Sequence, residues 1–172
     1  TLRGLVWGTS SGSSTYSVTS GTGTGTYTAS ITGLSITTNY FVRAFATNSV
    51  GTVYGAETSF TTLGIAPTVS ATASVTSITG STATSGGTIT SDGGATVTSR
   101  GLVWGTSSGS STYSVTSGSG TGTYTSSITG LTPGTLYYVR SYATNSVGTS
   151  YGAETSFTTS NYITIGNQAW SS

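Results

Sequence analysis

Hydrophobic and aromatic residues alternate with polar residues along most of the chain, most clearly between Gly130 and Gly148, which reads GLTPGTLYYVRSYATNSVG. Beyond the turn at Pro133–Gly134, one parity holds Tyr137, Val139 and Ala143 and the other holds Tyr138, Arg140 and Tyr142. A period of two with aromatic and β-branched residues is typical of a strand with one buried face. The same pattern occurs earlier, at Gly33–Gly51.

Internal repetition organises the chain. The sequence from Thr1 to Thr62 reappears from Thr98 to Thr159 without a gap, and about 51 of roughly 62 aligned positions are identical. The spacing of about 97 residues is the size of one small β-sandwich and is too long for one turn of a solenoid. The repetition therefore predicts an array of similar modules.

The second copy is preceded by an extra segment, Gly64 to Val97, which reads as two strands. Val69, Ala71, Ala73 and Val75 alternate in the first, and the second spans Ala83 to Ile89. Both copies then share five predicted strands, whose sequences in the first copy are GLVWG, STYSV, TYTASITGL, YFVRAFATN and ETSFTT. Seven short strands without helical periodicity predict an all-β fold of tandem antiparallel sandwiches.

The first copy lacks the two strands that open the second. We therefore expect a partial module at residues 1–63 with the last five strands, a complete module at 64–160, and at 161–172 either the start of a following domain or a donated strand. Half a sandwich leaves apolar residues uncovered and a sheet edge unpaired. Either the chain is a piece of a longer polypeptide, or another subunit supplies the missing strands.

Composition narrows the classes of function. Charged residues make up 4% of the chain and the net charge is +1, so nucleic acid is an unexpected partner. No apolar run approaches the roughly 18 residues of a membrane helix, so membrane insertion is not expected. Without His or Cys, the chain lacks the commonest general base and thiol nucleophile, and we predict no enzyme activity, no cofactor and no metal site.

Two motifs carry a resemblance to fibronectin type III domains: G-L-x-P-G-T-x-Y before the sixth strand and A-x-N-x-x-G after it. The resemblance covers both repeats and implies a fibronectin type III/Ig-like sandwich. It also implies that Tyr137 is a tyrosine-corner residue whose hydroxyl bonds to backbone near Leu131. Tyr40 and Leu34 match them in the first copy, where Ile36–Thr37 replace Pro133–Gly134.

The stretch SDGGATVTSRGLVWGTS is similar to the fibronectin-like repeats of Bacteroidetes surface and secreted proteins. The tail, YITIGNQAW, resembles the start of a FISUMP-type domain. The usual second-strand tryptophan is missing, and Trp104 on the third strand is the available large core residue. These resemblances imply an extracellular or cell-surface location.

Two sets of aromatic residues are candidates for a contact surface. Trp7 and Trp104 could stack on sugars, but we favour core packing for both. Arg3 shares a face with Trp7, which predicts either a position at the end of the sandwich with the charged head in water or a bulge at Gly4. A second set should form an outward stripe on the sixth strand, paired through arginine with Glu57 or Glu154: Phe41, Arg43, Phe45, Tyr138, Arg140 and Tyr142.

These features favour a non-enzymatic structural repeat in the stalk or fibre of a bacterial surface protein, an adhesin-like spacer. Each module would advance the chain by roughly 30–35 Å, from strands of about eight to ten residues. The alternatives are a self-assembling filament subunit joined by β-strand donation and a carbohydrate-binding accessory module. The expected partners are neighbouring modules of the same chain or identical subunits, with surface glycans as further candidates.

Overall fold

The computed structural model describes the backbone of residues 1–165 and 168–171 and the side chains of residues 1–161. The chain divides into two compact units, Thr1–Gly64 (unit 1) and Ile65–Ser172 (unit 2). Every paired strand in the described residues is antiparallel, and these residues contain no helix. The prediction of an all-β fold built from antiparallel sheets is confirmed.

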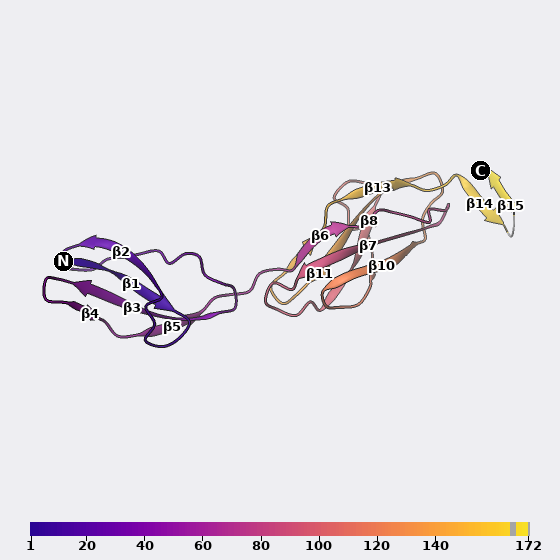
Figure 1. Ribbon diagram of the computed structural model, residues 1–172. Coiled ribbons are helices and arrows are strands. Elements are labelled where there is room, and N and C mark those ends of the chain that lie inside the picture. Colours follow the sequence, from indigo (N-terminus) through magenta and orange to yellow (C-terminus); the bar gives the residue numbers. More distant parts are fainter. Residues whose placement is uncertain (166–167, 172) are drawn as a thin grey trace. The chain divides into compact units, whose positions relative to one another are not determined.

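The sandwich of unit 2 consists of two sheets (Figure 1). The first has the order β10-β7-β6; the second has the order β12-β11-β8-β9, with β13 also paired to β11. The strands are β6 (Thr68–Thr72), β7 (Thr82–Ser91), β8 (Ser99–Gly105), β9 (Tyr113–Thr116), β10 (Gly122–Thr129), β11 (Leu136–Thr144), β12 (Thr149–Tyr151) and β13 (Thr155–Thr158). The predicted seventh strand, ETSFTT, is β13, and β12 is an additional short strand on the same edge of β11.

The core of unit 2 lies between these two sheets. The first sheet contributes Ala83, Ile89, Tyr124 and Ile128, and the second contributes Leu102, Trp104, Tyr137, Val139, Ala143 and Phe157. Inward-facing residues of both sheets pack in one cluster, as a β-sandwich requires. This arrangement is the fibronectin type III-like sandwich that the sequence predicts.

The first strand of unit 2 departs from its predicted alternation. Its pairing with β7 shifts register on both sides of Val69, and the strand ends at Thr72. An irregularity of this kind changes which face the following residues occupy. Val69 and Val75 pack against the core, whereas Ala71 and Ala73 are exposed, so the prediction of one continuous alternating face over Val69–Val75 was wrong.

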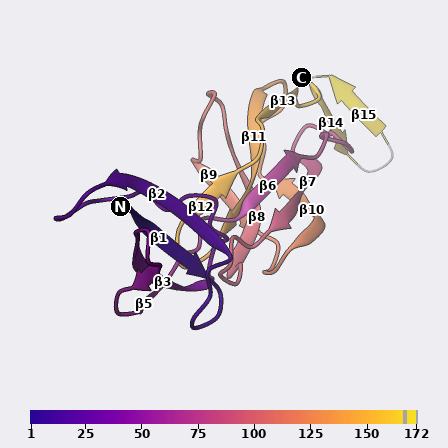
Figure 2. The same cartoon turned by 60° about the vertical axis from the view of Figure 1, so that its left-hand side comes forward.

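Unit 1 has a single sheet with the order β2-β1-β3-β4, with β5 also paired to β3. Its strands are β1 (Leu2–Gly8), β2 (Tyr16–Thr22), β3 (Asn39–Thr47), β4 (Thr52–Tyr54) and β5 (Thr58–Thr61). Both views draw the connection from β2 to β3 as an irregular loop (Figures 1 and 2).

The strand predicted at Thr26–Leu34 is therefore absent from unit 1, which corrects the sequence prediction. Its counterpart in unit 2, β10, pairs with β7 at eight successive positions from Gly122 to Thr129. Unit 1 has no counterpart of β7, so the same sequence has no ladder to join. Strand formation here depends on the partner strand more than on the alternating pattern.

The chain ends in a two-stranded sheet of its own, in which β14 (Tyr162–Ile165) pairs with β15 (Gln168–Ser171). The side chains of this segment lie outside the described residues. The FISUMP resemblance and the donated-strand hypothesis for residues 161–172 both stay predictions.

Candidate functional site

The hydroxyl of Tyr137 accepts a hydrogen bond of 3.1 Å from the backbone N–H of Thr132, one residue beyond Leu131. Tyr137 is 4% exposed and its ring stacks on Phe157. The same contact joins Tyr40 to the N–H of Ser35 at 3.0 Å, although the turn in unit 1 lacks the Pro–Gly pair. The hydroxyl of each tyrosine thus fixes the turn before the strand that carries it.

We expect Tyr137→Phe to lower the free energy of unfolding of unit 2 by about 1 kcal/mol, because the N–H of Thr132 loses its partner. Tyr138→Phe is the matched control, since Tyr138 is half-buried on the opposite face of the same strand. Urea unfolding, monitored by hydrogen exchange of the β11 amides, measures the loss of stability in both variants. Equal losses in the two variants would contradict a role for the corner bond.

Both predicted tryptophans are buried. Trp7 and Trp104 are each 7% exposed, and Trp104 belongs to the core cluster of unit 2. Each stacks on a tyrosine of the adjoining strand: Trp7 on Tyr16 at 5.9 Å between ring centroids, and Trp104 on Tyr113 at 6.0 Å. The tryptophan rings are consequently not open platforms for a sugar.

The predicted stripe on the sixth strand is half-buried along its length: Phe41, Arg43 and Phe45 in unit 1, and Tyr138, Arg140 and Tyr142 in unit 2. In unit 2 the guanidinium of Arg140 lies 4.6 Å from the ring centroid of Tyr151 and donates to the carbonyl of Gly109 at 2.7 Å. Arg43 makes the same contacts with Tyr54 and Gly12. Each arginine therefore holds a loop against its own sheet: the loop after β1 in unit 1 and the loop after β8 in unit 2.

A glutamate completes this anchor in each unit. The carboxylate of Glu154 accepts hydrogen bonds from Ser108 Oγ at 2.6 Å and Gly109 N at 2.7 Å, and lies 4.0 Å from Arg140 Nε. The hydrogen bond from Ser108 contributes most to lowering the pKa of Glu154 from its usual 4.5, followed by that from Gly109; Arg140 lowers it further, while burial opposes them. Glu57 has an equivalent set of partners, and its pKa is also lowered.

The lowered pKa of Glu154 predicts a loss of stability in acid. A carboxylate whose pKa is lower in the folded state stabilises the protein above its unfolded pKa, and this contribution disappears as the pH falls through the folded pKa. We expect unit 2 of the unsubstituted protein to lose stability below about pH 4.5, and Glu154→Gln to flatten that decline. Urea unfolding at several pH values measures it. Glu57→Gln is the control and should leave the profile of unit 2 unchanged.

A second arginine in each unit holds a loop through hydrogen bonds to its carbonyl groups. Arg100 lies 5.2 Å from the ring centroid of Tyr124 and donates to the carbonyl of Thr121 at 2.6 Å. The hydroxyl of Tyr124 in turn donates to the carbonyl of Gly101, and burial raises the pKa of Tyr124 to about 12. Loop carbonyls and an aromatic face therefore hold the guanidinium of Arg100.

Arg3 makes the same loop contact in unit 1, where its Nη1 donates to the carbonyl of Thr24 at 2.9 Å. The β1–β2 ladder shifts register between Leu2 and Gly4, and the extra residue lies on β2 rather than on β1. Gly21, within that irregular part of β2, has a φ of +85°, a conformation that favours glycine. The predicted bulge is therefore present on the strand opposite Gly4.

The open face of the unit 1 sheet is the largest difference between the two units. Phe60 is 36% exposed, whereas its counterpart Phe157 is 6% exposed. Val139 and Ser141 are completely buried, whereas the counterpart of Val139, Val42, is half-buried and that of Ser141, Ala44, is exposed. Leu34 is likewise only half-buried, whereas Leu131 is buried. Nothing in unit 1 corresponds to the sheet that covers these positions in unit 2.

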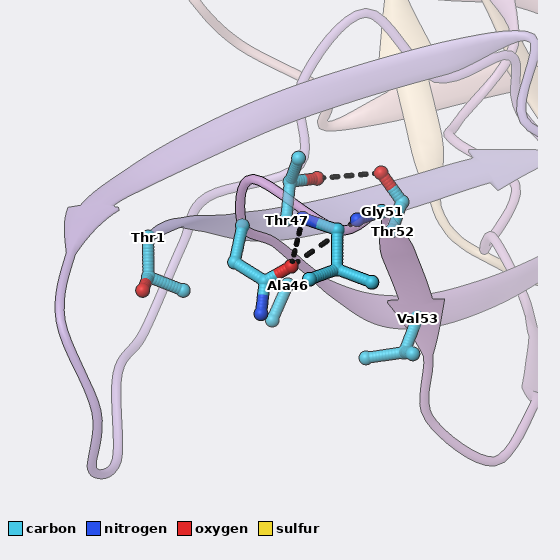
Figure 3. A pocket seen from close by; sticks show the side chains of 8 residues that line it. Thr1, Ala46, Thr47, Gly51, Thr52 and Val53 are labelled. Carbon is cyan, nitrogen blue, oxygen red and sulfur yellow. Dashed lines mark hydrogen bonds between the residues drawn. The ribbon is translucent and has the colours of Figure 1, made fainter.

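Two hollows lie on unit 1. One, of about 450 Å³, is lined by Arg3, Gly23–Gly25, Tyr27, Ala44–Ala46 and Val53–Gly55, together with Thr1. The other, of about 240 Å³, is lined by Thr1, Ala46–Asn48 and Val50–Val53. Figure 3 shows the side chains of Thr1 and Val53 on opposite sides of the smaller hollow. We call Tyr27, Ala44, Ala46, Val53 and Gly55 the acceptor face.

Several residues that organise these sites were not predicted from the sequence. Tyr54 and Tyr151 hold the arginines of the stripe, Gly55 belongs to the acceptor face, and Gly152 is its counterpart in unit 2. The signal was present in the motif Y-G-A-E-T, which both copies repeat without change. Its meaning depends on the short strand that leads into it, β4 in unit 1 and β12 in unit 2, which periodicity does not reveal.

The described residues contain no group of three or more acidic, His or Cys side chains able to hold a metal ion. Within the same part of the chain, no helix is long and apolar enough to cross a membrane.

The chain matches no known family model and no curated protein. Among solved structures it is similar to the FN1–FN3 domains of chicken CNTN1, with 17% identity, a TM-score of 0.47, and 92% of this chain and 55% of that chain covered. It is also similar to domains A168–A170 of titin, with 18% identity, a TM-score of 0.41, and 72% of this chain and 41% of that chain covered. This chain thus spans about half the length of the first of these structures.

A third similar structure is the sensor domain of the anti-sigma factor RsgI4 in Pseudobacteroides cellulosolvens. It shares 17% identity with a TM-score of 0.42, and covers 55% of this chain and 94% of that chain. The fibronectin type III-like assignment rests on the two sheets of unit 2 and their strand order.

Proposed function

We propose that the chain is a non-enzymatic structural repeat in the stalk or fibre of a bacterial cell-surface or extracellular protein, an adhesin-like spacer. The observation that carries the proposal is that two nearly identical copies direct the same arginines and glutamates to internal contacts. Arg43 and Glu57 anchor a loop of unit 1, and Arg140 and Glu154 anchor the same loop of unit 2. Repeated copies whose charged groups serve the fold suit a spacer better than a recognition surface.

Length measurement on the native full-length protein tests this proposal. Deleting one repeat of about 97 residues should shorten the protein by roughly 30–35 Å in electron micrographs of single molecules. Antibody raised against unit 2 should label intact cells. An unchanged length, or label that appears only after lysis, would contradict the spacer role.

A filament joined by strand donation is the second candidate, and the open face of unit 1 favours it. A sheet face that lacks its covering strands is a site for strands from another chain. Purified filaments should dissociate in boiling SDS into single polypeptides if donation joins them, because no covalent bond then links the units. Ladders of longer covalent chains would instead support the spacer.

A carbohydrate-binding module has less support, because Trp7 and Trp104 are buried and the stripe arginines contact loop carbonyls. Tyr142 remains half-buried on the outer face of the sheet. Binding to a glycan array that is lost in the Tyr142→Ala variant would support this function. If the chain binds no sugar at millimolar concentration, this function is ruled out.

A further inference from the structure

In unit 2, the place equivalent to the larger hollow is filled by β6. The backbone N–H of Ser141 donates to Thr72 Oγ1 at 2.9 Å, and Ser141 Oγ donates to the carbonyl of Ala71 at 3.0 Å. A Cβ built on Gly152 would overlap Ser141 Oγ and lie 2.9 Å from Thr72 Oγ1. Strand β6 thus packs closely against β11 and against Gly152, the residue that follows β12.

The matching positions of unit 1 leave this space open. A Cβ on Gly55 would meet only Ala44, at 3.6 Å from its Cβ and 3.8 Å from its carbonyl oxygen. Both glycines donate the same backbone hydrogen bond of 2.9 Å, Gly55 to Ala44 and Gly152 to Ser141, so the local backbone is alike. The hollow therefore has the position and the backbone of a site for a strand like β6.

The smaller hollow matches a second contact of the same covering segment. In unit 2, Asn145 Nδ2 donates to the carbonyls of Ile65 and Asp92, at 2.8 and 2.7 Å, while its Oδ1 accepts from the turn that follows. Asn48 Oδ1 accepts from the same turn in unit 1, but Asn48 is exposed and its Nδ2 has no acceptor among the described residues. Its amide is poised for two carbonyls of an incoming chain.

One strand would not complete unit 1. In unit 2, β6 covers the part of the face near Ser141, and β7 supplies the ladder on which β10 forms. In unit 1 the counterpart of β10 is irregular although its sequence is almost the same. An occupant with two strands would satisfy both the acceptor face and the loop at Thr26–Leu34.

The lining of the acceptor face defines the chemistry of the occupant. Relative to unit 2, Ala44 replaces Ser141 and Val53 replaces Ser150, so the face is more apolar. Arg3, the one charged residue in the larger hollow, already donates to loop carbonyls. The segment that covers unit 2, Ile65–Val97, carries a single charge, at Asp92. An extended chain with almost no charge fits this surface.

We propose that unit 1 is a binding site for an extended two-stranded polypeptide segment of the chemistry of Ile65–Val97: nearly uncharged, rich in Thr, Ser, Ala and Val, and with glycine where it crosses β3. A glycine is required there because a Cβ on Gly87 would lie 2.5 Å from Ser141 Cβ, and Ala44 carries a Cβ at the same place in unit 1. The site needs no assumption about a stalk or a filament.

The test adds a synthetic Ile65–Val97 peptide to the ¹⁵N-labelled full chain and follows the amide signals. We expect saturable shifts at Ala44, Gly55 and the Asn48 side-chain amide, and slowed hydrogen exchange at Thr26–Leu34. A Gly87→Val peptide should not bind. Gly55→Val in the full chain should raise the Kd at least about tenfold, since its side chain fills the space that the incoming strand needs.

A second variant tests the smaller hollow independently. Asn48→Asp keeps the oxygen that accepts from Val50 and Gly51 but removes the Nδ2 donor, so the turn persists while the affinity for the peptide falls. The proposal is overturned if the unsubstituted chain shows no saturable binding. Equal affinity in Gly55→Val would also overturn it, because the peptide would then be exchanging into unit 2 instead of binding unit 1.

Discussion

Replacing Gly152 by valine should lower the free energy of unfolding of unit 2 by about 2–3 kcal/mol, because the added side chain must displace the strand packed against it. A Cβ at this position would overlap Ser141 Oγ and lie 3.0 Å from the carbonyl carbon of Ala71. Both contacts involve groups that hydrogen-bond β6 to β11. The backbone there cannot retreat without breaking those bonds.

The same substitution at Gly55 is the matched control, because the two glycines occupy the same place in the repeated motif Y-G-A-E-T. At Gly55 the added Cβ meets Ala44 at an ordinary contact distance of 3.6 Å. We expect Gly55→Val to change stability by less than about 0.5 kcal/mol. Urea unfolding with hydrogen exchange read separately in each unit measures both effects. Equal losses would contradict the open acceptor face.

Repetition and alternation in the sequence were sufficient to predict the class of fold. They identified the strand that carries Tyr137 and the two strands that precede the second copy. The corner residue was found because its motif, G-L-x-P-G-T-x-Y, has a recognisable turn before the tyrosine. These features are local, so a single sequence carries them.

What the sequence did not reveal depends on contacts between distant strands. The stretch from Thr26 to Leu34 has nearly the same residues as its counterpart in unit 2, yet it forms no strand because its ladder partner is missing. The irregular register at Val69 likewise arises in pairing with β7 and leaves no mark on the alternating pattern. The loop carbonyls that hold the arginines are likewise brought close to them only by the fold.

Truncation of an equivalent isoleucine should destabilise unit 2 much more than unit 1. Ile128 is fully buried between the sheets of unit 2, so Ile128→Ala should cost about 2–5 kcal/mol through lost burial and the cavity left behind. Its counterpart, Ile31, lies half-buried on the irregular loop of unit 1, and Ile31→Ala should cost less than about 1 kcal/mol. Hydrogen exchange of the amides in each unit measures the two losses within one chain.

The isoleucine pair also indicates how far unit 1 is from a complete module. If a two-stranded segment closes the acceptor face, Ile31 becomes buried as Ile128 is, and its truncation should then cost several times more than in the free chain. Repeating the exchange experiment with saturating Ile65–Val97 peptide tests this step. A cost for Ile31→Ala that the peptide leaves unchanged would mean that no second sheet forms over unit 1, whatever else the peptide contacts.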